Sequence, residues 1–175
     1  MGDSTITIIG IFLAAILLFI FPLMAMSDRT DDVSQLAVQT ATTEFVENIR
    51  TTGRLSNANY SQYIEKLAAT GNSYDVELEV QVLDENPGKK AVQTETTKIG
   101  ENVYYNLYTS QILGEYLDQN KTLALKEGDI ISATAKNTNL TIAQQLKNAF
   151  YKVTGNDTYQ IAAQHAGIVT VNGGY

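Results

Sequence analysis

The 175-residue chain has no cysteine and no tryptophan, and it contains one histidine and two prolines. Without cysteine it can form neither a disulfide framework nor a thiolate metal site. Twelve basic residues stand against 19 acidic ones, for a net charge of −7. Phosphate binding needs clustered lysine and arginine, and the nearest candidate, Lys89–Lys90, adjoins Asp84 and Glu85 in a sequence typical of a solvated turn. The charge therefore argues against nucleic acid as a partner.

Residues with chemical reactivity are few and do not form a known catalytic pattern. His165 would have to act in acid–base catalysis without a cysteine or a serine in a nucleophile elbow, so a structural role is favoured. Glu77 and Glu79 alternate with apolar residues, which is typical of the solvated face of a strand. The sequence Asp84-x-Asn86-x-Gly88 begins like a calcium loop but lacks the distal glutamate. We therefore expect no enzyme activity, no cofactor and no metal.

What the chain does contain is a long apolar run at its N-terminus. No charged residue occurs between Ser4 and Ser27, and 6–26 is almost continuously apolar. As a helix these residues would span roughly 31 Å, close to the hydrocarbon thickness of a bilayer. We expect residues 1–27 to form a transmembrane or assembly helix.

Three interpretations of this run are open. Ala25 and Ser27 suit the −3 and −1 positions of a cleaved secretory signal, but a basic segment is missing and the apolar stretch is long for a signal. The second interpretation is a plain membrane anchor. The third is a helix that begins in the membrane and then packs into the core of a polymer.

Small residues and one proline favour the third interpretation. Gly10 and Ala14 form a small-xxx-small pair with Ala15 beside it, which would let another helix approach closely. Pro22 removes one backbone donor and predicts a bend near the end of the run. We expect these four residues to take part in helix packing.

The charges and the composition disagree about orientation. Arg29, Arg50 and Arg54 follow the apolar run, so the positive-inside rule would keep the remainder of the chain in the cytoplasm. Its surface composition, rich in threonine and asparagine, favours export. We expect an extracytoplasmic domain.

The remaining sequence predicts an α+β domain. Residues 28–53 should continue the helix as an amphipathic half, and residues 54–175 should form the head domain, with short helices and a small antiparallel sheet. We predict helices over 57–67, 101–119 and 142–153. Asn57 or Asn59 should cap the first of these helices, and Asn139 or Thr141 should cap the last. Strands are predicted over 76–82, 130–136 and 159–171, with a possible strand over 91–99. The expected inward stripe of the long helix is Val33, Leu36, Ala37, Thr40, Ala41, Phe45, Val46 and Ile49.

The apolar helix with Pro22, its amphipathic continuation to Ile49 and the small αβ head resemble type IV pilins, and more closely the TadE-like pseudopilins. The resemblance implies a subunit that waits in the membrane and is drawn into a filament with a core of such helices. The family's glutamate at mature position five has no counterpart, because Thr5, or Thr7 after cleavage behind Gly2, stands there. Asp3 is the hypothetical replacement, pairing with the terminal amine of a neighbouring subunit.

We therefore expect a structural, pilin-like subunit of a cell-surface filament that polymerises through its N-terminal helix, with Leu36 and Phe45 among the packing residues. Its partners would be copies of itself, the bilayer before assembly, and pilus or secretion machinery. One alternative is a single-pass accessory protein of a secretion or conjugation apparatus whose head binds a protein. Another is an anchored sensor or ligand-binding head, in which Tyr104, Tyr105, Tyr108 and Tyr116 are the residues to inspect first.

Overall fold

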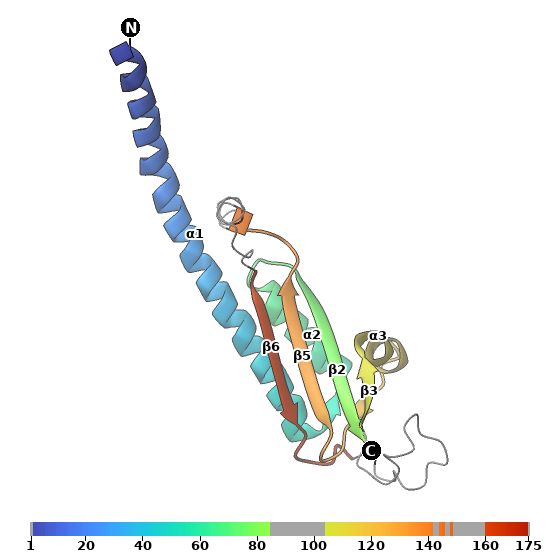
Figure 1. Ribbon diagram of the computed structural model, residues 1–175. Helices are drawn as coiled ribbons and strands as arrows, with labels where there is room; N and C mark the ends of the chain where they lie inside the picture. The colour runs from blue at the N-terminus through green and yellow to red at the C-terminus, as the bar shows by residue number, and fades with distance from the viewer. Residues whose placement is uncertain (1, 85–103, 142–143, 146–147, 149–159, 175) are drawn as a thin grey trace, which may run out of the picture. The chain divides into compact units, whose positions relative to one another are not determined.

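The structure is a computed structural model that describes residues 2–84, 104–141, 144, 145, 148 and 160–174. It contains helices and an antiparallel sheet, which confirms the predicted α+β class (Figure 1). The chain forms two compact units. The N-terminal unit comprises Met1–Leu36 and Asn139–Ile161, and the head unit comprises Ala37–Thr138 and Ala162–Tyr175.

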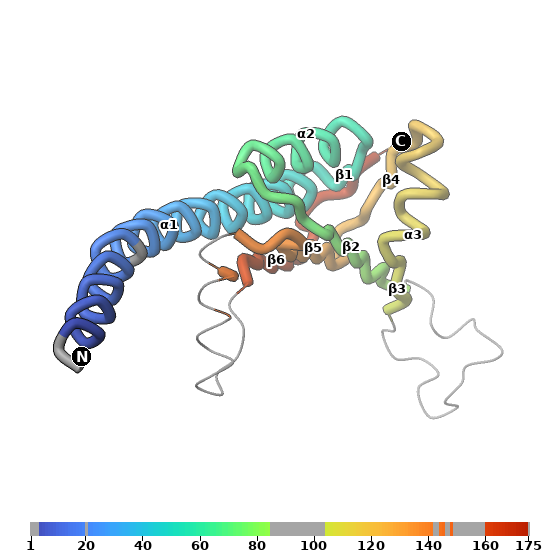
Figure 2. The backbone as a smooth tube through the Cα atoms, turned by 90° about the horizontal axis from the view of Figure 1, so that it is seen from above, coloured from blue at the N-terminus to red at the C-terminus, as the bar shows by residue number. Residues whose placement is uncertain are grey.

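The long helix α1 runs from Gly2 to Thr52, with Pro22 inside it, and agrees with the helix predicted from the sequence (Figure 2). Gly53 follows its last residue, and the Gly53 φ of 66° lies in the left-handed region that glycine adopts without strain. Since α1 supplies residues to both units, the apolar N-terminal run and the beginning of the head belong to one continuous helix.

The predicted inward stripe of α1 is right in its second half and wrong in its first. Val33 and Leu36 are 68% and 65% exposed, and Ala37 and Thr40 are exposed as well. At 100° per residue, positions 33, 36 and 40 lie on the side of the helix opposite to Phe45. Two apolar rows run along α1, and the packing of the head buries the row that contains Val38 and Phe45. Its buried residues recur at steps of one and three: Val38, Ala41, Thr42, Phe45, Val46 and Ile49.

After the two-residue strand β1, Arg54–Leu55, helix α2 spans Asn57–Ala68. Its N-cap is Ser56, in place of the predicted Asn57 or Asn59, and the Ser56 hydroxyl accepts a hydrogen bond from the Asn59 backbone N–H at 3.3 Å. Serine is favoured there because its short hydroxyl reaches an N–H group that has no partner inside the helix. Tyr63 and Leu67 are the buried residues of α2, while Tyr60 and Ile64, which the sequence also predicts to face inward, are half-buried.

In the described part of the chain, the main sheet has four antiparallel strands in the order β3-β2-β5-β6. Strand β2 spans Tyr74–Leu83, β5 spans Ile130–Asn137, and β6 spans Ala162–Ile168, which is shorter than the predicted 159–171. Strand β2 pairs with β5 along almost its whole length, from Tyr74 opposite Asn137 to Gln81 opposite Ile130. The possible strand over 91–99 lies outside the described residues.

The predicted helix over 101–119 is wrong for residues 104–108. Strand β3, Tyr104–Tyr108, adds to the edge of β2, with Val82 opposite Tyr105 and Val80 opposite Leu107. Aromatic residues favour strands, and the edge of β2 offers backbone partners that a local periodicity cannot reveal. The helical part begins with the short helix α3, Thr109–Gln111, and continues as the π-helix η3, Ile112–Leu117.

One face of the sheet forms the core of the head unit. Figure 2 shows α2 and the C-terminal part of α1 on the same side of β2 and β5. A Cβ placed on Gly167 in β6 would lie 2.8 Å from the Arg50 Cδ and 3.7 Å from the Val46 Cγ1, so α1 lies directly on this strand. The buried sheet residues facing the helices are Leu78, Val80, Ile131, Ala133, Ala135 and Ala163.

The C-terminal segment of the head crosses the end of α1 at very short range. Strand β4, Leu123–Ala124, pairs with β1. Next to this pair, the Gly173 N–H donates to the Leu125 carbonyl, and the Leu125 N–H donates to the Gly53 carbonyl, both at 2.8 Å. A Cβ on Gly173 would overlap the Gly53 carbonyl oxygen and lie 2.6 Å from the Gly53 carbonyl carbon. A side chain therefore cannot be accommodated there without a backbone shift.

Within the N-terminal unit, the segment after Asn139 begins a helical turn. The Thr141 Oγ1 accepts from the Gln144 N–H at 3.2 Å, and the Gln144 Oε1 accepts from the Thr141 N–H at 3.1 Å. This reciprocal pair is a capping box and identifies Thr141, one of the two predicted caps, as the cap residue. Residues 144, 145 and 148 are helical, and the other residues of the predicted helix lie outside the described part of the chain.

Candidate functional site

The N-terminal part of α1 presents large apolar side chains on all sides. Ile6, Phe12 and Leu18 are 69%, 70% and 70% exposed, and Phe19 and Phe21 are 66% and 63% exposed. A helix that is apolar all round needs apolar surroundings, because a surface helix of a soluble protein keeps a polar face. Removing one such side chain from water is worth about 1.5–3 kcal/mol, so removing all of them from water is worth on the order of tens of kcal/mol.

Of the helices that the structure describes, α1 is long and apolar enough to cross a membrane. Its apolar window is not buried by any other part of the described chain. These two properties support the predicted membrane anchoring through the N-terminal helix.

The predicted packing residues in this segment are exposed and accessible to another helix. A Cβ on Gly10 would meet no heavy atom within 4 Å, and Ala14, Ala15 and Pro22 are exposed. One turn of helix separates Gly10 from Ala14, so both lie on one side of α1. The Asp3 backbone belongs to α1, but its side chain lies outside the part that the structure describes.

The other two predicted packing residues have opposite environments. Leu36 is 65% exposed, whereas Phe45 is 5% exposed. The Phe45 ring stacks on Tyr63 of α2 with 4.4 Å between ring centroids and 10° between ring planes. Phe45 therefore packs α1 against α2 inside the head, while Leu36 remains accessible to another molecule.

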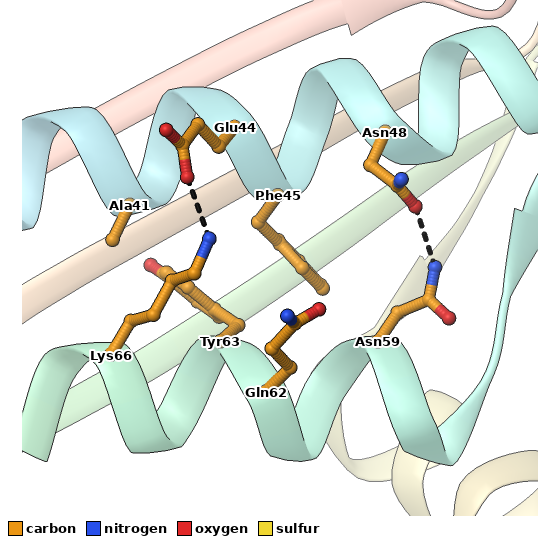
Figure 3. A pocket seen from close by; sticks show the side chains of 8 residues that line it. All are labelled: Ala41, Glu44, Phe45, Asn48, Asn59, Gln62, Tyr63 and Lys66. Atoms are coloured by element: carbon orange, nitrogen blue, oxygen red, sulfur yellow. Dashed lines mark hydrogen bonds and ion pairs between the residues drawn. The ribbon is translucent and has the colours of Figure 1, made fainter.

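A shallow groove of about 210 Å³ lies between α1 and α2 (Figure 3). Glu44 and Lys66 form an ion pair across it at 2.6 Å, and the Asn59 Nδ2 donates to the Asn48 Oδ1 at 2.7 Å. The stacked rings of Phe45 and Tyr63 lie beneath these bridges and are nearly inaccessible. Because the polar groups already pair across the groove and its aromatic residues are buried, the groove is best explained as the seam that joins two helices.

A larger cavity of about 450 Å³ lies in the head unit, between the end of β2, strand β3 and the π-helix η3. Tyr105 and Tyr116 line it, which are two of the four tyrosines selected from the sequence. Strand alternation places Tyr104 and Tyr108 on the other face of β3, so they do not share this site. The sequence alone could not separate the two pairs, because it predicted a helix where the chain forms a strand.

Asp129 supports one wall of this cavity. Its Oδ1 accepts from the Leu83 N–H at 2.9 Å and its Oδ2 accepts from the Lys126 N–H at 2.8 Å. Asp129 is 2% exposed, and both oxygens of its carboxylate bind backbone N–H groups. They fix the turn between β4 and β5, where Gly128 has a φ of 95°.

The reactive side chains considered from the sequence make ordinary structural contacts. The His165 Nε2 lies 3.4 Å from the Glu47 Oε1, and Glu47 also pairs with Arg50 at 2.8 Å. On the solvated face of β2, Glu77 lies 3.4 Å from the Lys136 Nζ. Among the described residues, no three histidine, aspartate or glutamate side chains gather closely enough to hold a metal ion. Asn86, Gly88 and Lys89–Lys90 lie outside those residues.

A buried carboxylate in the N-terminal unit was not predicted from the sequence. Asp31 is 1% exposed, and the Thr141 Oγ1 donates to its carboxylate, with both oxygens at 3.1 Å. Since the same hydroxyl accepts from the Gln144 N–H, it connects α1 to the start of the following helix. The Thr-x-x-Gln spacing signals the cap, but nothing local indicates that Asp31 is its partner.

Comparisons of this chain with protein-family models, with curated proteins and with solved structures give no match.

Proposed function

We propose that this protein is a non-catalytic structural subunit, held in the membrane by its N-terminal helix and assembled through that helix into a cell-surface filament. The observation that carries the proposal is the N-terminal part of α1, where exposed apolar side chains surround the helix over a length sufficient to cross a bilayer. The proposal also rests on the resemblance of the overall plan to pilins and TadE-like pseudopilins.

Assembly through α1 follows from the surface of the helix. In lipid, helices gain little from hydrophobicity when they associate, so close packing between small residues matters most. Gly10 has no side chain and Ala14 has a small one, so a second helix can approach α1 closely at these residues. The exposed Val33 and Leu36 lie beyond the apolar run on α1 and offer additional apolar contacts to a neighbour. A filament core built of such helices would replace lipid by protein around each one.

The lack of cysteine permits a direct test by disulfide crosslinking. Ala14→Cys, produced in the native cells and oxidised in isolated surface material, should give covalent dimers, because copies would meet along the side of α1 that contains Gly10. Ile16→Cys is the matched control. It lies two residues further on, about 200° around the helix, and should crosslink more weakly. Non-reducing electrophoresis provides the measurement.

Electron microscopy of sheared cell surfaces supplies the second measurement, and filaments labelled by an antibody against this chain are the expected result. Equal crosslinking of both cysteine variants, together with an absence of labelled filaments, would overturn the proposal. Small detergent-dependent oligomers would then favour an anchored accessory protein of a secretion or conjugation apparatus.

A further inference from the structure

The head unit contains a cavity that assembly through α1 does not use. It measures about 450 Å³, which lies within the range of about 300–1,000 Å³ that is common for small-molecule sites. Strands β2 and β3 form one side of it, and the π-helix η3 with the segment up to β4 forms the other. The whole cavity therefore belongs to one compact unit.

One wall of the cavity has an uncommon backbone conformation. At the end of η3 the Asp118 N–H donates to the Leu113 carbonyl, and in the turn that follows the Lys121 N–H donates to the Tyr116 carbonyl, both at 2.8 Å and both spanning five residues. Such turns account for well under about 1% of residues and are frequent at functional sites. Here the π-helix carries Tyr116, which lines the cavity.

The lining combines an apolar base with polar groups. Val82, Leu107 and Leu123 supply the aliphatic part, and Tyr105, which is 51% exposed, lies beside them. A partly exposed phenol presents a flat apolar face together with a hydroxyl that donates and accepts hydrogen bonds. The lining therefore suits a ligand with an apolar face and several polar substituents.

The charges around the cavity select against a strongly charged ligand. Lys126 and Asp84 lie in the lining with opposite signs, and both carboxylate oxygens of Asp129 hold backbone N–H groups. A phosphate would need an excess of positive charge, which this lining does not provide. A ligand without net charge suits a lining that contains charges of both signs.

We infer that this cavity binds a neutral saccharide, with the sugar ring stacked on Tyr105. A pyranose has a face of C–H groups that covers an aromatic ring, and hydroxyls at its edge that reach polar side chains. Thr122 would receive one of those hydroxyls, and Tyr116 would close the cavity from the side of the π-helix. The inference is independent of filament assembly, because every residue it uses lies in the head unit.

Saturation-transfer NMR on the full chain tests this binding directly. The protein is kept in phosphocholine micelles, because glycosidic detergents would compete for the site. The probes are methyl β-glucoside, methyl β-galactoside, N-acetylglucosamine and its β1,4-linked disaccharide. We expect saturation transfer to at least one probe, and Tyr105→Ala should raise the Kd of that probe at least about tenfold through loss of ring stacking.

Tyr104→Ala is the matched control, because it removes a neighbouring tyrosine of the same strand on the opposite face of the sheet. It should leave the Kd unchanged. Thr122→Val keeps the shape of an exposed side chain while removing one hydroxyl, and it should weaken binding even if Tyr105→Ala fails to fold.

Absence of transfer to all four probes would overturn the inference. Equal losses in Tyr105→Ala and Tyr104→Ala, each with a native circular dichroism spectrum, would also overturn it. Transfer to indole in place of the saccharides would overturn it as well and would assign the cavity to a planar aromatic ligand.

Discussion

At the scale of single residues, Tyr63 shows how the core of the head accommodates a polar group. The side chain is 2% exposed, stacks on Phe45, and shares a hydrogen bond of 2.9 Å with the buried Thr42 hydroxyl. Burial raises the pKa of Tyr63 above its ordinary value of 10.0, an effect that the Thr42 hydrogen bond opposes and the neighbouring Tyr60 reinforces. The folded protein therefore favours the neutral phenol.

This raised pKa predicts a loss of stability in alkaline solution. Below pH 10 the phenol is neutral in both states, whereas above it the unfolded state ionises first and binds fewer protons than the folded state. The free energy of unfolding should therefore fall as the pH rises above about 10. Tyr63→Phe should reduce this slope, measured by urea unfolding of the full chain in micelles at a series of pH values.

Thr42→Val serves as the control for that series, because it keeps the buried phenol and removes its hydrogen-bond partner, together with the bond from the Thr42 hydroxyl to the Val38 carbonyl. The variant should retain the alkaline slope, although its stability at neutral pH should fall by about 1 kcal/mol. A Tyr63→Phe variant with the wild-type slope would contradict the explanation.

Gly173 illustrates a residue whose size is set by a contact far away in the sequence. A Cβ at this position would overlap the Gly53 carbonyl oxygen, and this backbone cannot move aside as a flexible side chain can. Gly173→Ala should lower the free energy of unfolding by about 1–3 kcal/mol, the usual cost of overpacking. Chemical unfolding followed by circular dichroism measures the change.

Gly174→Ala provides the matched comparison, since a Cβ at Gly174 would meet nothing within 4 Å. Its effect should stay within about 0.5 kcal/mol, as for most surface substitutions. If both variants were equally stable, the close crossing of Gly53 and Gly173 would not describe the protein in solution.

At the scale of elements, the helix that begins after Thr141 depends on one hydroxyl. The Thr141 Oγ1 accepts from the Gln144 N–H and donates to the buried Asp31 carboxylate. Thr141→Val has nearly the same shape but makes neither bond, and the loss of a partner for a buried charged group adds to the loss of the cap. We expect this segment to become less stable by about 1–3 kcal/mol.

Hydrogen exchange of the Gln144 and Gln145 amides provides the measurement, and both should exchange faster in Thr141→Val. Thr141→Ser retains the hydroxyl and should exchange at close to the wild-type rate. Faster exchange in both variants would show that the methyl group, and not the hydroxyl, stabilises the segment.

At the scale of the whole molecule, the apolar part of α1 and the core of the head are separate in sequence. The exposed apolar run ends at Met26, whereas the buried residues of the head begin at Val38 on the same helix. A variant lacking residues 1–27 should therefore keep its fold and no longer require detergent. Size-exclusion chromatography and circular dichroism, compared with the full chain in micelles, check both expectations.

Retention of large oligomers by this shortened variant in the absence of detergent would place the assembly contacts in the head. A loss of its circular dichroism signal would show that the first 27 residues contribute to folding of the head. Either result would contradict the division of roles along α1.

Local sequence patterns determined the long helix, the strands β2 and β5 and the membrane-length apolar run. Each of these patterns is formed by residues that lie a few positions apart in the sequence, and the same residues make up the helix or strand. The Thr-x-x-Gln capping box and the alternation in 76–82 are of this kind. For the same reason the spacing of Gly10 and Ala14 was enough to predict two small residues on one side of a helix.

Only the tertiary structure decided which apolar row of α1 is buried, that residues 104–108 form a strand, and that Tyr105 and Tyr116 share a cavity. These features depend on partners that are distant in the sequence: the strand β6 against which Val46 packs, the edge of β2 beside Tyr105, and the π-helix that carries Tyr116. Backbone hydrogen bonds to a neighbouring strand and burial against a remote element outweigh a local preference of less than about 1 kcal/mol per residue.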